Sequence, residues 1–287
     1  MIKAKLTYSF KDRKSFENKV LPYIFGKGIF YRKGYSVKHK DKKIEFIIQV
    51  KSLSQLITAS TGMLRYSPGS KLEEIRIIKT EPKKLPKNEY ENLNEIILGA
   101  ILKPSLLENP AAIKKIVKFS IENNLQFVKD DDASDYSKKE ATKIKKLMGN
   151  LPYFQKISNE NSLISKHTMI VPWVDGWELS EKIGKKAIIM VHCANLSPQI
   201  SWNSQIIFSR VAGASFAIVP DSLFDKTFNL FSSIKTAKQR IKGLKPIKLI
   251  VSGGINPKRI IKIKNSLKRE DYRSIGFAIG SWILNKN

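Results

Sequence analysis

The sequence contains one cysteine, Cys193, among 287 residues. A single cysteine excludes an intramolecular disulfide framework and fits a reducing compartment. Long hydrophobic runs are also missing, because no apolar stretch approaches the roughly 20 residues that a transmembrane helix needs. The first ten residues, MIKAKLTYSF, lack the apolar segment of a signal peptide. These absences predict a cytoplasmic protein without a membrane partner.

Acidic residues are scarce relative to basic ones. Lys and Arg total 52 against 25 Asp and Glu, which gives a formal net charge of +27. Such a charge is compatible with binding to nucleic acid or another polyanion. However, the lysines are scattered along the chain, arginine is uncommon, and no basic stripe is interleaved with aromatic residues. The composition therefore disfavours nucleic acid as the main partner, and salt-dependent binding of a polyanion stays an alternative.

Residues 95–132 have the pattern strand, loop, helix, strand. The apolar run 96–102 ends at Lys103 and is typical of a strand buried on both faces. After a helical segment, a second apolar run, 125–128, ends in the sequence KDDD at 129–132. Two parallel strands joined by a helix place both polar ends at the same edge of the sheet. In α/β barrels this edge carries the chemistry.

The side chains of Lys129 and Asp131 point to the same side of their strand, because side chains alternate along a strand. A buried lysine among carboxylates has two interpretations. The first is an ion pair, or a solvated acidic start to the next helix. The second is a metal site, but Mg²⁺ prefers an octahedron of oxygen ligands, so Asp131 and Asp132 alone make a weak site. A carbamate formed from the lysine and CO2 would add a third anionic oxygen ligand.

The two strand ends, LGAILKP and FVKDDD, resemble the barrel core of the RuBisCO large chain and the RuBisCO-like proteins. That family has a G-x-x-[IL]-K-P strand end followed by an F-x-K-D-D-E strand end. The resemblance implies that Lys129 becomes the carbamate and binds Mg²⁺ together with Asp131 and Asp132. It also implies that Lys103 handles the proton during enolisation.

Several positions depart from the family pattern. Asp132 stands where the family usually has glutamate, and Ser105 stands where carboxylating members have a lysine. Met63 occupies the place of an asparagine that reaches into the partner subunit's active site, and Val219 that of a histidine in the sixth barrel strand. Cys193 replaces an arginine that binds a phosphate.

The order of expected elements indicates two domains in an α/β protein. The first ninety residues follow the order strand, helix, strand, strand, helix, strand, which is that of a ferredoxin-like α+β domain. We predict this domain over 1–93 and an abridged TIM (β/α)8-type barrel over 94–287. Only about 35 residues separate Asp132 from the next clear strand at 168–174, whereas two βα units typically need about 30 residues each. We therefore expect a compressed or lost unit between 133 and 167.

Two further residues match active-site positions of the family. His192 is the only one of the three histidines at the C-terminal end of a predicted core strand, and it matches the first histidine of the family's H-R-A-M-H strand end. Lys226 falls where the lysine of a mobile loop closes over the substrate. The alternatives are a structural histidine with satisfied hydrogen bonds and a solvated loop lysine.

A glycine turn indicates a phosphate site. Ser252, Gly253 and Gly254 follow a predicted strand and precede a helix, so backbone N–H groups and the helix dipole can meet an anion. Tight packing is the alternative. By resemblance, this turn and Gly280–Ser281 after the last strand would together hold one phosphate.

The resemblance also implies how the chain assembles. The family's eighth barrel helix is missing from the expected elements, so we expect the apolar residues Ile279, Trp282 and Ile283 to be exposed or covered by a partner subunit. This predicts a homodimer or higher homo-oligomer.

The implied function is Mg²⁺-dependent enolisation of a phosphorylated ketone or ketose, similar to the enolase or isomerase of methionine salvage or to a decarboxylase of phosphorylated oxo-acids. One alternative is a catalytically lapsed protein retained for binding or assembly. The other is true carboxylation of ribulose bisphosphate, which Ser105, Cys193, Val219 and Met63 disfavour.

Overall fold

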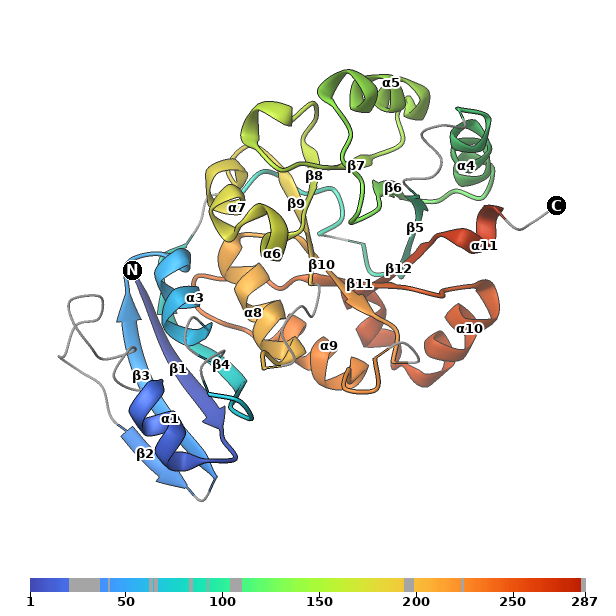
Figure 1. Cartoon of the computed structure of the whole chain (residues 1–287). Coiled ribbons are helices and arrows are strands. Elements are labelled where there is room, and N and C mark those ends of the chain that lie inside the picture. The colour runs from blue at the N-terminus through green and yellow to red at the C-terminus, as the bar shows by residue number, and fades with distance from the viewer. Residues whose placement is uncertain are drawn as a thin grey trace. The chain divides into compact units, whose positions relative to one another are not determined.

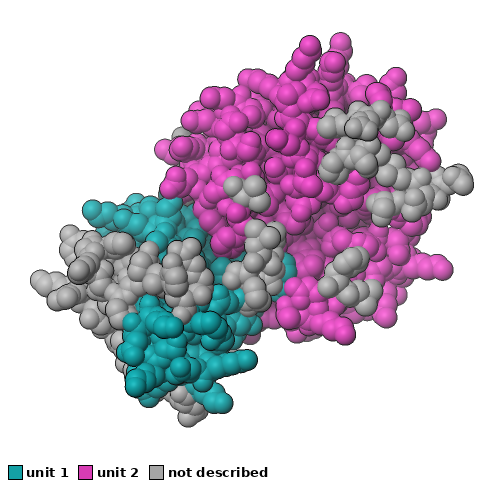
Figure 2. All heavy atoms as spheres, in the orientation of Figure 1, with its two compact units in different colours: residues 1–84, 195–213, 239–246 teal, residues 85–194, 214–238, 247–287 magenta. Residues whose placement is uncertain are grey.

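The computed structural model describes residues 1–20, 37–40, 42–61, 64, 67–82, 85–91, 93–103, 110–193, 199–222 and 225–284. The chain divides into two compact units (Figure 2). The first unit comprises 1–84, 195–213 and 239–246, and the second comprises 85–194, 214–238 and 247–287. Each unit therefore combines segments that are distant in the sequence.

The first unit is built on an antiparallel sheet with the strand order β2-β3-β1-β4 (Figure 1). Its elements are β1 (Ile2–Ser9), α1 (Arg13–Lys19), β2 (Val37–Lys40), β3 (Lys43–Val50), α3 (Leu53–Thr61), β4 (Lys71–Thr80) and α8 (Trp202–Ala212). The order of the first six elements and the order of the strands are those of a ferredoxin-like domain. The sequence-based prediction of this domain is confirmed.

Alternation along β1 positions the core of this unit. Ile2, Ala4, Leu6 and Tyr8 are all at most 6% exposed, because every second side chain of a strand faces the same side. The ring of Tyr8 stacks on that of Phe46 in β3, with centroids 5.3 Å apart. The alternating pattern of the sequence thus becomes one buried face of the sheet.

The second unit is a closed barrel of eight parallel strands in the order β10-β11-β12-β5-β6-β7-β8-β9. The strands are β5 (Ile97–Leu102), β6 (Phe127–Asp130), β7 (Tyr153–Lys156), β8 (His167–Ile170), β9 (Ile188–His192), β10 (Phe216–Pro220), β11 (Lys248–Ser252) and β12 (Ile275–Ile279). The α-helices of this unit are α4 (Pro110–Glu122), α5 (Lys138–Met148), α6 (Pro172–Asp175), α7 (Trp177–Ile183), α9 (Leu230–Lys238), α10 (Pro257–Ser266) and α11 (Ser281–Leu284). This is the TIM-type barrel that the sequence predicted.

The shortened region of the barrel has lost no strand. After α5, β7 and β8 are connected through a 3-10 helix of three residues, Glu160–Ser162, instead of an α-helix. Both strands still pair in parallel with their neighbours. Of the two expectations for residues 133–167, compression is the one that the structure shows.

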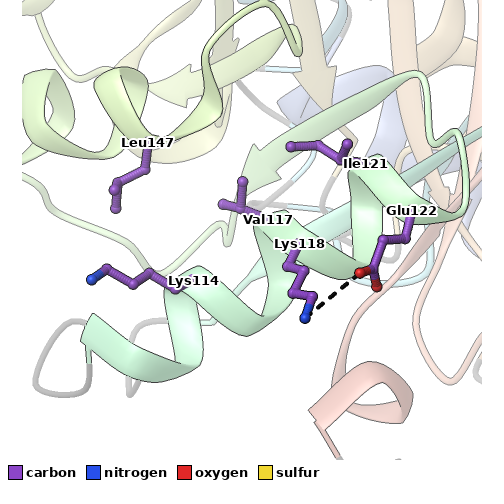
Figure 3. A pocket seen from close by; sticks show the side chains of 6 residues that line it. All are labelled: Lys114, Val117, Lys118, Ile121, Glu122 and Leu147. Carbon is purple, nitrogen blue, oxygen red and sulfur yellow. Dashed lines mark ion pairs between the residues drawn. The ribbon is translucent and has the colours of Figure 1, made fainter.

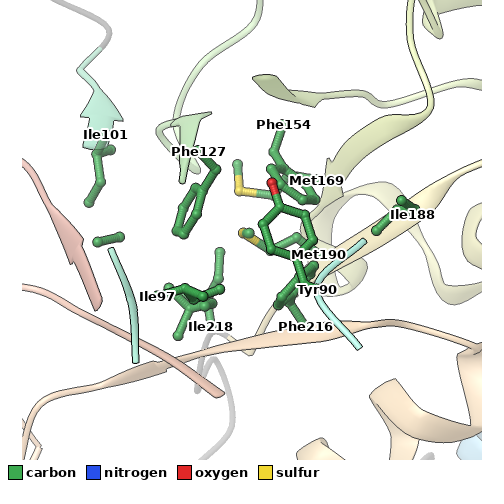
Figure 4. Packing of buried hydrophobic residues seen from close by; sticks show 12 residues of the cluster. Tyr90, Ile97, Ile101, Phe127, Phe154, Met169, Ile188, Met190, Phe216 and Ile218 are labelled. Atoms are coloured by element: carbon green, nitrogen blue, oxygen red, sulfur yellow. The ribbon is translucent and has the colours of Figure 1, made fainter. Parts of the chain in front are cut away.

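The interior of the barrel is a packed apolar core (Figure 4). Phe154 makes edge-to-face contacts with Phe127 and Phe216, at centroid distances of 5.8 and 5.5 Å. Tyr90, which precedes the first barrel strand, adds a further edge-to-face contact with Phe216. Gly99 faces the ring of Phe127, and a Cβ at this glycine would overlap that ring. The barrel is thus filled below its carboxyl edge.

The last helix covers apolar residues that we expected to be uncovered. Ile279 is 4% exposed and Ile283 is 1% exposed. The ring of Trp282 in α11 packs edge-to-face on Phe119 of α4, with centroids 6.1 Å apart. The expectation that these residues are exposed or covered by a partner subunit was therefore wrong for Ile279 and Ile283, and α4 of the same chain packs against α11.

Candidate functional site

The carboxyl ends of the first two barrel strands bring an acid and a lysine into contact. Lys103 directly follows β5 and Asp131 directly follows β6, and these strands are paired in parallel. The Lys103 ammonium forms an ion pair with Oδ2 of Asp131 at 2.5 Å. The Lys103 side chain is 39% exposed, whereas that of Asp131 is 10% exposed. The expected meeting of these two strand ends is present.

Lys129 lies deeper in the barrel than Lys103. It is 1% exposed, its ammonium donates to the backbone oxygen of Asp130 at 2.8 Å, and it lies 3.7 Å from the sulfur of Met169. Burial lowers the pKa of Lys129 to about 8, and the charges of Asp131 and Asp132 partly oppose this shift. A lysine with a lowered pKa has a larger fraction of neutral amine, which is the form that reacts with CO2.

His192 ends β9 and is influenced by the same charges. The pKa of His192 is lowered to about 3: burial is the largest cause, the positive charges of Lys129 and Lys103 add to it, and the charge of Asp131 opposes them. Its Nδ1 atom is buried and has no hydrogen-bond partner among the described residues. Lys103, Lys129, Asp131 and His192 therefore belong to one electrostatic group, in which the imidazole is neutral at physiological pH.

Asp130 supports this group from the other side of β6. It is fully buried, accepts a hydrogen bond from the Tyr153 hydroxyl at 2.7 Å, and accepts another from the backbone N–H of Lys156 at 2.8 Å. Burial raises the pKa of Asp130 to about 7, against the effect of these hydrogen bonds. Asp130 thus connects the end of β6 to β7. Its neighbours Lys129 and Asp131 face the opposite side of the strand. Our sequence reasoning assigned it no role, although alternation along the strand already separates it from Lys129 and Asp131.

The donor atoms of this group fit Mg²⁺ only with a carbamate. Asp131 is buried and Asp132 is exposed, and the described residues hold no cluster of three His, Cys, Asp or Glu side chains that could bind a metal. Two carboxylates leave an octahedral cation short of protein ligands. A carbamate on Lys129 would supply the third anionic oxygen, so the residues fit the cation on that condition.

The glycine turn after β11, predicted as a phosphate site, has two glycines in the left-handed region. Gly253 and Gly254 adopt φ values of 91° and 61°, which side chains with a Cβ rarely tolerate. Asn256 then caps α10 by accepting a hydrogen bond from the Arg259 N–H at 3.0 Å. The turn begins at Ser252, the last residue of β11. The N-terminus of the ten-residue helix α10 therefore lies three residues after Gly254.

Gly280 connects this corner with the lysine group. It follows β12, and a Cβ built on it would lie 3.4 Å from Cε of Lys103. Ser281 is the first residue of α11. Gly280 therefore lies beside Lys103.

Other predicted positions do not join the group in the described part of the chain. Lys226 is exposed, in a turn after β10. Cys193, at the family's arginine position, is 3% exposed. Ser105 and Met63 lie outside the described residues.

Two features after the strand ends were not anticipated. Arg259 in α10 forms a bidentate ion pair with Asp221, which follows β10, and both carboxylate oxygens accept from it at 2.5 Å. Lys156, the last residue of β7, forms an ion pair with Asp175 of α6 at 3.8 Å. The strand that carries Lys156 has four residues, so its sequence pattern was too short to show that a lysine ends it.

A groove of about 330 Å³ on the outside of the barrel is separate from this site (Figure 3). It lies between α4 and α5 and is lined by Lys114, Val117, Lys118, Ile121, Glu122 and Leu147. None of these residues belongs to a barrel strand or to a loop after one. The groove therefore takes no part in the chemistry at the strand ends.

Among the described residues, no helix is long and apolar enough to span a membrane. No protein-family model matches the sequence. No curated protein matches it either.

Solved structures match the chain over nearly its whole length. The RuBisCO-like protein from Rhodopseudomonas palustris has a TM-score of 0.67 at 14% identity, covering 97% of this chain and 94% of that one. Octameric RuBisCO from Pyrococcus horikoshii has a TM-score of 0.65 at 14% identity, with 97% and 82% covered. The RuBisCO-like protein MtnW from Alicyclobacillus acidocaldarius has a TM-score of 0.62 at 14% identity, with 97% and 88% covered. This chain therefore has the fold of RuBisCO and the RuBisCO-like proteins.

Proposed function

We propose that this protein is a divergent RuBisCO-like enzyme that uses Mg²⁺ to enolise a phosphorylated ketone or ketose. The observation that carries the proposal is the convergence of Lys103, Lys129, Asp131 and His192 at one end of the barrel, where the ion pair and the pKa shifts connect them. These residues occupy the carboxyl edge of the barrel, where α/β barrels carry their chemistry. The fold is that of proteins named as RuBisCO-like, which include MtnW.

In this proposal Asp131, Asp132 and the carbamate of Lys129 hold the cation. When bound, Mg²⁺ would polarise the substrate carbonyl as a Lewis acid. The surroundings of Lys129 suit carbamate formation, because burial favours its neutral amine. The Lys129 ammonium contacts Met169 and the backbone oxygen of Asp130. Once the nitrogen has lost a proton, its lone pair can react with CO2.

Lys103 is the proposed base that removes the proton beside the carbonyl. In the structure its ammonium is paired with the Asp131 carboxylate, so the same residue pair would hold Lys103 beside the substrate. Proton transfer by a positioned side chain typically contributes 10²- to 10⁴-fold in rate. His192 is neutral and half-buried, so its imidazole would contact the substrate without adding a positive charge.

The phosphate of the substrate is proposed to bind at Ser252–Gly254 and Gly280. Because Gly280 lies beside Lys103, a phosphate held there places the adjacent carbons next to the base. The substrate class that follows has a phosphate a few bonds from a carbonyl. Methionine-salvage intermediates and phosphorylated oxo-acids both satisfy this condition.

The enolisation test is hydrogen exchange. A panel of phosphorylated ketones and ketoses is incubated in D₂O with Mg²⁺ and bicarbonate, and NMR follows the loss of the C–H signal beside the carbonyl. Lys103→Ala is expected to slow exchange at least about 100-fold. Lys262→Ala, an exposed lysine of α10, is the matched control and should leave the rate unchanged. Absence of exchange with every member of the panel would contradict the proposal.

A second candidate is a protein that has lost catalysis and retains binding or assembly. Cys193 is buried at the place of the family's phosphate-binding arginine, and Lys226 is exposed, which favours this candidate. Carbamate formation separates the two. With ¹³CO2 and Mg²⁺, the active-site proposal predicts a carbamate resonance that Lys129→Ala removes and Lys262→Ala retains. If both variants give the wild-type spectrum, the carbamate assignment is wrong and the second candidate is favoured.

Two further properties belong to the proposal. Val219 is 1% exposed and Cys193 is 3% exposed, so neither supplies the polar group that carboxylation of ribulose bisphosphate uses in the family. We therefore expect no fixation of labelled bicarbonate.

We also propose a homo-oligomer, since the Pyrococcus horikoshii RuBisCO is octameric. Light scattering should show a mass larger than the 32.7 kDa of one chain.

A further inference from the structure

The groove between α4 and α5 collects exposed apolar side chains. Among the described residues, six large apolar side chains are exposed, and two of them, Ile121 and Leu147, line this groove at 56% and 41% exposure. Val117 adds a third apolar side chain to the lining. Single exposed apolar residues are common on protein surfaces, whereas apolar side chains that gather in one concave place indicate a binding site.

The groove arises because the apolar stripe of each helix is wider than the part that the barrel covers. In α4, Val117 is buried, and Ile121 lies one turn later on the same stripe. In α5, Ile144 is buried, and Leu147, three residues later, is exposed. Figure 3 shows Leu147 on α5 at one side of the groove and Val117 and Ile121 on α4 at the other. An apolar cavity of about 150 Å³ holds benzene, so a groove of about 330 Å³ has room for about two side chains of similar size.

The surroundings of the groove are basic. α4 and α5 carry three and five lysines and one glutamate each, so lysine exceeds glutamate by eight to two, against 52 basic to 25 acidic residues in the whole chain. Both glutamates already have partners, because Glu122 pairs with Lys118 at 3.7 Å and Glu140 accepts from the Ser137 N–H at 2.8 Å. Lys114 and Lys118 line the groove itself. An acidic partner is therefore attracted to this face.

We propose that this groove binds an acidic amphipathic helix of a partner protein. In helix-in-groove recognition, apolar side chains three or four residues apart enter the groove as anchors. Two such anchors match the volume of the groove, and acidic residues beside them would meet Lys114 and Lys118. The inference is independent of the proposed chemistry, because none of the lining residues lies at the carboxyl edge of the barrel.

Two other occupants fit this face less well. A second copy of the chain offers no strongly acidic helix among the described residues; α7, for example, has two glutamates against one lysine. An anionic bilayer would meet the lysines, but its surface is flat, whereas Val117, Ile121 and Leu147 line a groove between two helices. A helix can bring single apolar side chains into that space.

The test uses synthetic peptides of about 18 residues, which is long enough to form a helix. The acidic peptide has leucines three and four residues apart on one face and glutamates on the others. One comparison peptide has the same composition with its leucines distributed around the helix, and another has lysine in place of every glutamate. In fluorescence polarisation at about 50 mM salt, the wild-type chain should bind the acidic peptide at least about tenfold more tightly than either comparison peptide.

A pair of serine variants tests the apolar lining. Ile121→Ser with Leu147→Ser should weaken binding of the acidic peptide at least about tenfold, which corresponds to the loss of about one buried apolar side chain. The matched control is Phe231→Ser with Ile261→Ser, in α9 and α10, where the two side chains are 56% and 57% exposed. This control should change the affinity less than about twofold.

A pair of charge reversals tests the lysines and stays informative if the serine variant does not fold. Lys114→Glu with Lys118→Glu should weaken binding at least about tenfold at about 50 mM salt and less at about 500 mM, because salt screens exposed charges. Lys258→Glu with Lys262→Glu has the same spacing at exposed positions of α10 and controls for the change in net charge. It should weaken binding less than about threefold.

Three results would overturn the proposal. The first is equal binding of the three peptides, or groove variants that bind like their controls. The second is binding to vesicles of phosphatidylcholine and phosphatidylserine in equal parts, lost in Ile121→Ser with Leu147→Ser, without binding of the acidic peptide; this would assign the face to a membrane. The third is a smaller assembly of that serine variant in light scattering, again without peptide binding, which would assign the face to a contact between copies of the chain.

Discussion

Lys248 is expected to destabilise the barrel at neutral pH, so replacing it with methionine should raise stability. It is the first residue of β11 and is 7% exposed. Within the described part of the chain, its ammonium donates only to two backbone oxygens, of Leu93 at 3.4 Å and Glu95 at 3.3 Å. Burial lowers the pKa of Lys248 to about 8, and the charge of Glu95 only partly opposes this. Methionine has a similar length and carries no charge.

The sign and size follow from proton linkage. A lysine whose pKa is lower in the folded state binds its proton more weakly there, so its charged form lowers the free energy of unfolding. This loss is complete below the folded pKa of about 8 and fades as the pH rises toward the ordinary lysine pKa of 10.5. The difference between the ordinary lysine pKa of 10.5 and the folded value of about 8 corresponds to about 3 kcal/mol at pH 7 and about 1 kcal/mol at pH 10. Loss of the two long hydrogen bonds offsets about 1 kcal/mol at either pH. Lys248→Met should therefore gain about 2 kcal/mol at pH 7 and almost nothing at pH 10.

The assay is urea unfolding of wild type and variant at pH 7 and pH 10, followed by circular dichroism. Comparing the two proteins at each pH cancels the titration of all other lysines and tyrosines. Lys262→Met provides the exposed control and should change the free energy of unfolding by less than about 0.5 kcal/mol. A Lys248→Met variant that is less stable at pH 7, or whose gain is the same at both pH values, would refute the reasoning.

Three further predictions concern stability and turnover. Tyr153→Phe removes the hydroxyl donor of the buried Asp130 and should lower the free energy of unfolding by about 1–3 kcal/mol; equal stability in urea unfolding would mean that this hydrogen bond contributes nothing. Gly99→Ala introduces a methyl group that overlaps the ring of Phe127 and should cost about 1–3 kcal/mol or prevent folding, and an unchanged melting temperature would contradict this packing. If Lys226, exposed in this structure, closes over the substrate as the resemblance implies, Lys226→Ala should leave the melting temperature unchanged and slow the deuterium exchange described above; a wild-type exchange rate would exclude Lys226 from the site.

The first two barrel strands were predictable because their apolar runs are continuous and each ends in charged residues. A continuous apolar run of this length is typical of a strand buried on both faces. Alternation along the strand then placed Lys129 and Asp131 on one side. The contact between Lys103 and Asp131 followed from parallel pairing alone. The positions of Lys103, Lys129 and Asp131 could therefore be predicted from local sequence features, without knowledge of the rest of the fold.

Residues whose roles depend on distant partners were not predictable. β7 has four residues, too few to show a periodicity, so the position of Lys156 was not seen. Its contact with Asp175 depends on how α6 returns to the barrel. The burial of Ile283 likewise depends on the packing of α11 against α4, two elements at opposite ends of the barrel sequence. In each case the missing information was which segment lies alongside, and no single stretch of the chain contains it.

The barrel is closed by eight strands although β7 and β8 are connected by a 3-10 helix instead of an α-helix. Gln155 of β7 is fully buried, and its side-chain amide donates to the backbone oxygen of Ser162 at 3.0 Å and accepts from the N–H of Ile164 at 3.3 Å. One amide thus satisfies backbone groups that a helix would have satisfied internally. The link is thereby fixed to β7 at two points, and we expect its length to vary less among related sequences than the lengths of loops without such contacts.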